Sequence, residues 1–314
     1  MNPVTAPVDL SGKVSLVTGA TRGMGPVIAT ELARLGSTVV IVARSRNSGE
    51  QVRQQIAAHI GADRVEVLTA DLASQTDLHR LCEQFAARHA SLHILINNAG
   101  AHYRERSTNA DGVEMHVVVD YLAGFTLTNL LLDQLRAAAP ARVVNVVSAA
   151  MTDARMVKIR RRPQPVPLDP AHLDDLRHLN PAVGFDSFTA YATAKLLTLM
   201  SGYFLAERLR GTGITINAVH PGLVATSIAT DIAPPLMKPF LGLIRPFLLT
   251  PEQGAQAALH LATAPEMADV TGRYFDRATE SRSPTVSYDV ELQRRIWNLS
   301  VAYTAQPAVH DQPE

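Results

Sequence analysis

Three polar side chains of this sequence could together carry out proton chemistry. Tyr191 and Lys195 are four residues apart in the segment YATAK, and this spacing places both side chains on one face of a helix. Ser148 follows the apolar run VVNVV, which is typical of a buried strand. A tyrosine and a lysine at this spacing are common by chance. The pair therefore indicates a site only because Ser148 and the segment NNAG (residues 97–100) each follow a predicted strand.

A glycine-rich turn follows the first predicted strand. The segment TGATRGMG, residues 18–25, lies between a strand at 13–18 and a helix at 25–35. A sharp turn at this position lets backbone N–H groups approach a pyrophosphate at the N-terminus of the helix. The sequence therefore predicts a dinucleotide site formed by Gly19, Thr21, Arg22, Gly23, Met24 and Gly25.

The end of the second predicted strand, VVIVARSR, indicates which dinucleotide is bound. An acidic residue at this position would accept hydrogen bonds from both ribose hydroxyls and would favour NAD. Here Ala43 is followed by Arg44 and Arg46, and Arg22 adds a third positive charge. A guanidinium pairs well with a 2′-phosphate, so we expect NADP(H). The alternative is that Arg44 and Arg46 belong to a solvated loop.

Short β-branched runs alternate with helical patterns along the chain. Seven strands are expected, at about residues 13–18, 37–44, 64–72, 92–100, 141–148, 213–222 and 272–276. The helices between them include residues 25–35, 74–88, 111–138, 188–210 and 251–262. This order predicts an α/β, doubly wound Rossmann fold with a seven-stranded parallel sheet flanked by helices. We expect one domain at 1–280, with substrate-loop insertions at about 150–187 and 227–249, and a C-terminal helix and tail at 281–314.

The composition excludes several classes of protein. The chain has 314 residues, 46% of them hydrophobic, and a formal net charge of zero, so general nucleic-acid binding is not expected. Cys82 is the only cysteine, which excludes a disulfide scaffold. Neither a signal peptide nor an apolar window of about 18 residues is present, so we expect a cytoplasmic protein without a membrane span. His89 and His93 straddle a helix–strand boundary, and no metal site is expected.

Taken together, these motifs resemble the short-chain dehydrogenase/reductase family. The resemblance rests on TGATRGMG, ADL (residues 70–72), NNAG, VVNVVS, YATAK and HPGLVAT (residues 220–226), and it spans residues 13–276. Within the family, the chain is most similar to retinol-dehydrogenase-like reductases. That similarity rests on the segment DGVEMHVVVDYLAGFTLTNLLLDQL, the long gap between Ser148 and Tyr191, and a late helix around Trp297.

The resemblance implies a role for each matching residue. Tyr191 would be the general acid in reduction and the base in oxidation, and Lys195, together with the oxidised nicotinamide ring, would lower its pKa. Lys195 would also hold the nicotinamide ribose, and Ser148 would donate a hydrogen bond to the substrate oxygen. The other implied cofactor-binding residues are Asp71, Leu72, Asn97, Asn98, Ala99, Gly100, Pro221, Gly222, Val224 and Thr226. His220 could line the same cleft, although packing would explain it equally well.

Asp120 departs from the family pattern. The family has an asparagine here, in a segment resembling VNHLGHF, whereas this chain reads VDYLAGF. In the family this asparagine lies at a helix kink, and its backbone carbonyl holds a water that connects the lysine to a proton relay. A backbone role survives replacement by aspartate, so we expect Asp120 to occupy a fourth catalytic position. Its carboxylate could keep Lys195 charged or, if desolvated, could carry a proton itself.

The resemblance implies an NADP(H)-dependent oxidoreductase that transfers a hydride between nicotinamide and a bulky hydrophobic ketone, aldehyde or alcohol. Residues 150–187 and the apolar residues 227–249 would form the substrate pocket. A retinoid-like, steroid-like or polyketide-type compound would fit, the last as the substrate of a ketoreductase of secondary metabolism. The apolar segment could instead pack on a membrane surface or on a partner subunit, and a homodimer or homotetramer is possible. The alternative from another class is a non-catalytic NADP(H)-binding regulatory or scaffold protein, against which the intact Ser148, Tyr191 and Lys195 argue.

Overall fold

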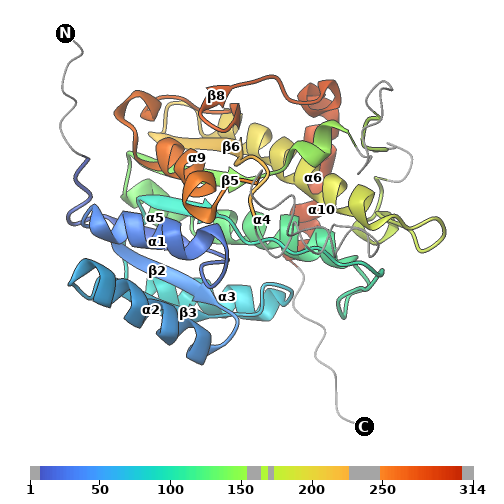
Figure 1. Cartoon of the computed structure of the whole chain (residues 1–314). Helices are drawn as coiled ribbons and strands as arrows, with labels where there is room; N and C mark the ends of the chain where they lie inside the picture. Colours follow the sequence, from blue (N-terminus) through green and yellow to red (C-terminus); the bar gives the residue numbers. More distant parts are fainter. Residues whose placement is uncertain (1–7, 154–163, 169–172, 226–247, 306–314) are drawn as a thin grey trace.

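The computed structural model describes residues 8–153, 164–168, 173–225 and 248–305. The basic run at 155–162, Thr226 and nearly all of the apolar segment 227–249 lie outside the described residues. Within the described part, a central sheet carries helices on both faces (Figure 1).

The structure confirms the predicted doubly wound α/β fold, but the sheet has eight strands rather than seven. Their order is β3-β2-β1-β4-β5-β6-β7-β8, and all pairs are parallel except β7 with β8. The additional strand has only two residues, both exposed and polar, so it carries no apolar pattern that a sequence reading could recognise. The strands are β1 (Val14–Val17), β2 (Thr38–Ala43), β3 (Val65–Thr69), β4 (Ile94–Asn97), β5 (Ala141–Val146), β6 (Ile214–His220), β7 (Tyr274–Asp276) and β8 (Thr279–Glu280).

Two helical layers cover the sheet. On one face, α1 (Met24–Arg34) packs between α2 (Arg46–Ile60) and α9 (Pro251–Thr263) over a core of valine, isoleucine and alanine side chains. On the other face lie α3 (Gln75–Ala86), α4 (Ala123–Leu130), α5 (Leu132–Ala137) and α6 (Ser187–Arg208). Short 3₁₀ helices occur at Ala149–Thr152, Leu176–His178, Pro265–Met267 and Thr285–Tyr288.

The expected helix at 111–138 is shorter than predicted and is not regular. Its first residues form a turn instead, because Gly112 adopts a left-handed φ of 81° and the Asn109 side chain accepts the backbone N–H groups of Asp111 and Val113. The helix then begins with a π-helical segment, η1 (Val117–Leu122), which contains Asp120. Segments of this wide geometry are often found at functional sites.

The late helix predicted around Trp297 is α10 (Val290–Thr304), and it lies along the outer side of α6 (Figure 1). Its fully buried Ile296 belongs to the same core as η1 and α6, and Trp297 stacks edge-on against Phe125 with ring centroids 4.8 Å apart. The buried Tyr121 hydroxyl bonds Ser201 Oγ at 2.7 Å and Ser300 Oγ at 2.5 Å, which ties η1, α6 and α10 together. Part of the apolar surface of η1 and α6 is thus covered by a helix of the same chain.

The packing of α10 predicts a large difference between two substitutions on this helix. Ile296→Ala should lower the free energy of unfolding by about 2–5 kcal/mol, because it removes a fully buried side chain from the shared core. Val301→Ala, at a position that is 41% exposed, should change it by no more than about 0.5 kcal/mol. Urea unfolding measures both values, and equal midpoints for the two variants would mean that α10 does not belong to the cooperative core.

Candidate active site

A single cleft gathers most of the predicted site residues at the carboxyl ends of β1, β4, β5 and β6. It includes the point at which the strand order changes direction, between β1 and β4, where open α/β sheets bind their ligands. Of the predicted residues, the cleft is lined by Gly19, Thr21, Arg22, Gly23, Met24, Asn98, Ala99, Gly100, Ser148, Tyr191, Lys195, Pro221, Gly222 and Val224. His220, whose place the sequence left open, also lines it, together with Val146, Val147, Leu223 and Leu248.

The glycine turn requires glycine for steric reasons. Gly19 has a φ of +63°, and a Cβ there would lie 2.8 Å from the Cα atom of Ala99. A Cβ on Gly25 would lie 2.1 Å from the Gly19 carbonyl oxygen. Gly25 does not line the cleft, and its absent side chain lets α1 start directly against the turn.

Thr18 and Asn98 fasten the ends of β1 and β4 to each other. The Thr18 hydroxyl accepts the backbone N–H groups of Asn98 (3.1 Å) and Ala99 (3.0 Å). In the other direction, Asn98 Nδ2 donates to the Thr18 carbonyl at 3.0 Å and to the Gly19 carbonyl at 3.2 Å. The sequence reading missed Thr18, whose only signal was its position at the end of the first strand.

Asn97 does not belong to the cleft, contrary to expectation. Its side chain is buried beneath the sheet end, where Nδ2 donates to Thr128 Oγ1 (3.1 Å) and Asn145 Oδ1 (2.9 Å). The alternation of side chains along a strand sends Asn97 to the opposite side from its neighbour. Asn97 is therefore a structural residue that links β4 to β5 and α4.

The two arginines after β2 differ in their surroundings. Arg46 lies in the first turn of α2, where Nη2 pairs with Glu50 at 2.8 Å and Nη1 donates to the Val67 carbonyl at 3.4 Å. Arg44 is exposed and makes no ion pair with any described residue. Of these two arginines, Arg44 thus keeps its N–H donors available for a ligand. The Arg46 guanidinium is already held by Glu50 and by the Val67 carbonyl.

Asp71 and Leu72 follow β3 and do not line the cleft. The Asp71 carboxylate accepts the backbone N–H of Ala73 at 3.0 Å and is exposed. Leu72 lines a small separate cavity that also borders Asp120. The structure therefore leaves their predicted contact with the adenine as a proposal.

Ser148, Tyr191 and Lys195 meet at one wall of the cleft. Ser148 caps the short 3₁₀ helix after β5, with Oγ accepting the Ala150 N–H at 3.2 Å. Tyr191 and Lys195 project from α6, as their spacing predicted, and each is more than nine-tenths buried. Lys195 Nζ lies 5.6 Å from the centroid of the Tyr191 ring and donates to the Val146 carbonyl at 3.4 Å.

Burial dominates the electrostatics of this wall. It raises the pKa of Tyr191, the negative charge of Asp120 raises it further, and a hydrogen bond with Ser148 acts in the opposite direction. Burial also lowers the pKa of Lys195, and the attraction of Asp120 partly opposes this. We expected a lowered pKa for Tyr191, but these surroundings raise it.

Asp120 is neither a surface acid nor a freely hydrated one. Its Oδ1 accepts the Ala101 N–H at 2.7 Å, while Oδ2 is buried and has no hydrogen-bond partner among the described residues. Burial raises the pKa of Asp120, against the opposing charge of Lys195. A proton on Oδ2 would remove the buried negative charge and so lower the cost of burying an oxygen without a partner. The backbone carbonyl of Asp120 accepts a hydrogen bond from Thr198 Oγ1 at 3.0 Å, which joins η1 to α6.

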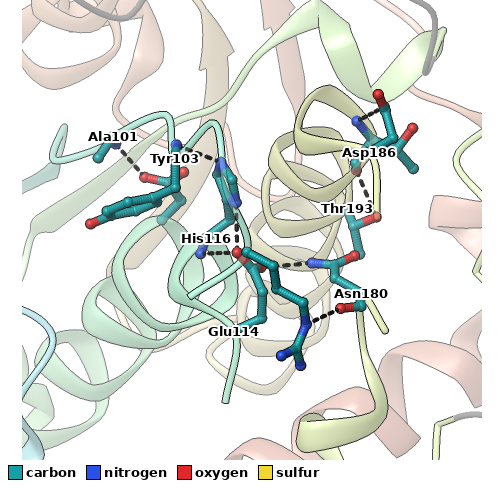
Figure 2. A network of polar contacts seen from close by, with 10 residues as sticks. Ala101, Tyr103, Glu114, His116, Asn180, Asp186 and Thr193 are labelled. Atoms are coloured by element: carbon teal, nitrogen blue, oxygen red, sulfur yellow. Dashed lines mark hydrogen bonds and ion pairs between the residues drawn. The ribbon is translucent and has the colours of Figure 1, made fainter. Parts of the chain in front are cut away.

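Figure 2 shows a buried polar network around Glu114 and His116 that was not predicted from the sequence. The His116 ring centroid lies 6.3 Å from that of Tyr191. The Nδ1 atom of His116 lies 2.7 Å from Glu114 Oε1, and Nε2 accepts the backbone N–H of Tyr103 at 3.0 Å. Asn180, from the insertion before α6, donates from Nδ2 to Glu114 Oε2 at 2.8 Å. The only signal in the sequence was a glutamate and a histidine two residues apart in an otherwise apolar stretch.

The histidines considered as metal ligands have structural partners. His93 Nδ1 accepts the Val14 N–H at 3.1 Å, and His89 Nε2 lies 3.3 Å from Glu66. No cluster of three or more histidine, cysteine, aspartate or glutamate side chains suited to a metal ion occurs in the described ranges.

Of the helices that the structure describes, none combines the length and apolar character needed to cross a membrane.

Comparisons with known proteins agree with this geometry. The sequence model of the short chain dehydrogenase family matches residues 13–158. Retinol dehydrogenase 12 of Bos taurus is 37% identical over 293 residues, which cover 93% of this chain and 86% of that protein. Polyprenol dehydrogenase of Danio rerio is 34% identical over 303 residues, covering 94% and 87%. Among solved structures, the RhlG/NADP active-site complex of Pseudomonas aeruginosa has a TM-score of 0.66 and 26% identity, covering 86% of this chain and 96% of that one.

The chain therefore belongs to the short-chain dehydrogenase family and is an oxidoreductase. Within the family it is retinol-dehydrogenase-like, since proteins of that name are 33–37% identical to it over most of its length.

Proposed function

We propose that this enzyme uses NADP(H) to interconvert a bulky hydrophobic ketone or aldehyde and the corresponding alcohol. The observation that carries this proposal is the meeting of Ser148, Tyr191 and Lys195 at one wall of the cleft that also contains the glycine turn. The names of the relatives, retinol dehydrogenase and polyprenol dehydrogenase, refer to long apolar alcohols and support the substrate class. The apolar composition of residues 227–249 supports it as well.

The residues of the cleft suit a dinucleotide. The N-terminus of α1 is capped by Gly23 without any side-chain hydrogen bond, and its first turn has no acidic residue. By contrast, serine, threonine or aspartate side chains cap α2, α3, α6, α9 and α10. The uncapped N–H groups of α1 would hold the pyrophosphate. Arg44 would pair with a 2′-phosphate, which accords with the NADP of the Pseudomonas aeruginosa complex.

The chain's own residues would supply proton transfer and charge stabilisation. The bound nicotinamide supplies or accepts the hydride. In reduction, Ser148 would donate a hydrogen bond to the substrate oxygen, and Tyr191 would give that oxygen its phenolic proton. Lys195 would hold the nicotinamide ribose and, when charged, would favour the tyrosinate that remains. The carboxylate of Asp120 accepts the Ala101 N–H in the loop after β4, and its negative charge would offset the positive charge of Lys195.

Tyr191→Phe should abolish turnover and leave cofactor binding intact. Because the phenolic proton has no substitute in the variant, NADPH oxidation with apolar aldehydes should fall by about 10²-fold or more. NADPH affinity, measured by fluorescence, should stay that of the parent. Tyr288→Phe is a matched control, since Tyr288 is 50% exposed and away from the cleft. Activity persisting in Tyr191→Phe would remove the tyrosine from the mechanism, and NADPH binding by a parent without turnover would favour the scaffold alternative.

Arg44→Ala should weaken NADPH binding by about tenfold or more, since a charged hydrogen bond to phosphate is lost, and should leave NADH binding unchanged. Arg46→Ala is the control, because Arg46 is held by Glu50. Calorimetric titration with both cofactors measures the preference. An unchanged ratio of the two affinities in Arg44→Ala would disprove the phosphate site.

Asp120→Asn should retain activity within about tenfold, because the side-chain oxygen that accepts the Ala101 N–H is kept. Its pH profile should shift. At alkaline pH, the negative charge of Asp120 raises the pKa of Tyr191, so removing that charge should lower this pKa. Alcohol oxidation, which needs the tyrosinate, should therefore rise at lower pH in the variant than in the parent. Asp133→Asn, at an exposed ion pair, should keep the parent profile, and a parent-like profile for Asp120→Asn would make Asp120 a purely structural residue.

A cytoplasmic location, a homodimeric or homotetrameric assembly and a role in secondary metabolism belong to the same proposal. The neutral net charge and the lack of a membrane span predicted from the sequence support the cytoplasmic location. The apolar helices around Asp120 and Tyr191 support the assembly, although α10 covers part of their surface. The role in secondary metabolism is supported by the apolar composition of residues 227–249, which would suit a polyketide-type ketone.

A further inference from the structure

Glu114 and His116 are fully buried, yet the proposed reaction uses neither residue. Both side chains are 0% exposed, and the His116 ring centroid lies 6.3 Å from that of Tyr191. Neither residue lines the cofactor cleft. Burying an ionisable pair is costly unless its polar atoms are satisfied, so a complete network at this place calls for an explanation.

The hydrogen bonds define the protonation state of the pair. A backbone N–H can only donate, so His116 Nε2, which accepts the N–H of Tyr103, carries no proton. The ring proton is then on Nδ1 and is donated to Glu114 Oε1. Burial alone would raise the pKa of Glu114, but the hydrogen bonds and charge attraction of His116, together with a hydrogen bond from Asn180, outweigh burial and lower it. Glu114 is therefore a charged acceptor, and the orientation of the His116 ring is fixed by one partner on each of its two nitrogens.

This pair connects two segments that are far apart in the sequence (Figure 2). On one side is the loop after β4, where the N–H of Tyr103 is bound by His116 and the N–H of Ala101 by Asp120. On the other side is Asn180, in the insertion before α6. Its side chain donates to Glu114, and its carbonyl accepts Arg106 Nε at 2.8 Å. Asn180 has a left-handed conformation, with a φ of 52°, and is held there by the hydrogen bonds of its side chain and of its backbone carbonyl.

The two connected segments flank Tyr191. The ring of His102, next to Tyr103, lies 6.1 Å from the ring of Tyr191 and 5.4 Å from that of His116. Fixing the backbone of Tyr103 therefore also restrains the backbone of His102, whose ring lies beside the proposed proton donor. Asn180 borders an outer pocket that reaches Thr189 and Thr193 on the first turns of α6.

We propose that Glu114 and His116 form a positioning unit for the substrate side of the active site. The unit holds the loop at 101–106 and the segment around Asn180 at a fixed separation, and this separation sets how large a carbonyl compound can reach Tyr191. Both residues act through others and do not touch the reacting atoms. The inference rests on the proposed function, because it assigns the size selectivity of that same site.

Two substitutions break the unit from opposite sides. In His116→Asn, the amide can still donate toward Glu114 but is too short to accept the N–H of Tyr103. Asn180→Ala removes the donor to Glu114 from a half-buried loop residue, where loss of folding is not expected. His116→Gln is the conservative variant, because its amide oxygen can reach the place of Nε2. Val183→Ala, at a side chain that is 92% exposed in the same insertion, is the control.

The experiment compares all-trans-retinal with benzaldehyde as probes in the NADPH-loaded enzyme. For retinal, the KM should rise about tenfold in His116→Asn and Asn180→Ala, the scale of one lost buried hydrogen bond, with kcat within about threefold. For benzaldehyde, which is too small to span both segments, KM should stay unchanged. His116→Gln should recover most of the retinal KM, NADPH affinity should be that of the parent throughout, and hydrogen exchange at residues 101–106 should accelerate only in His116→Asn.

The proposal is overturned if the retinal KM of both variants equals that of the parent, or if both probes and NADPH lose affinity together, which would indicate general loss of structure. If the parent reduces no carbonyl at all, the proposed function fails. The affinity of the NADP⁺-loaded protein for retinal, measured by fluorescence quenching, then decides the inference. A tenfold loss in the two variants supports it, and equal affinities, or no retinal binding by the parent, refute it.

Discussion

The burial of ionisable groups around α6 is the constraint on which the rest of the site depends. Tyr191, Lys195 and Asp120 are all more than nine-tenths buried, and Glu114 and His116 lie beside them without any exposed surface. Because each of these groups has little or no surface exposed to solvent, its charge state depends mainly on the hydrogen bonds and charges that its neighbours offer. The charge of Asp120 supports Lys195, and three N–H groups of His116 and Asn180 support Glu114. Oδ2 of Asp120 has no hydrogen-bond partner among the described residues. The pKa of each of these residues thus depends on the charges and hydrogen bonds of the others.

The topology of the sheet explains why these groups meet. Strand order reverses between β1 and β4, and the turn that follows each strand lies at this edge. Thr18 and Asn98 fasten the two ends, and Gly19 and Gly25 allow backbone atoms to approach where a side chain would not fit. α6 then crosses the same edge and brings Tyr191 and Lys195 to Ser148. Rigid strands and a long helix therefore carry the site, with the loops placed around it.

Much of this arrangement could be predicted from local sequence patterns, because apolar strands and i, i+4 pairs are local signals. The seven longer strands, the glycine turn and the shared face of Tyr191 and Lys195 are of this kind. The failures concern information that is not local. The direction in which Asn97 points depends on the pleat, the pairing of Arg46 with Glu50 depends on where α2 begins, and the turn at Gly112 interrupts an apparently continuous helical pattern. The Glu114–His116 network was missed because its partners, Tyr103 and Asn180, come from separate loops.

The position of α10 in the chain affects when the site can become complete during synthesis. α6 carries Tyr191 and Lys195, but its outer side is covered by Ile296 and its neighbours, which follow every strand of the sheet. A nascent chain that has already produced every sequence motif of the family still exposes the apolar side of its active-site helix. The catalytic and cofactor motifs alone therefore do not identify a chain able to complete this site, because the segment that finishes it lies after the last of them.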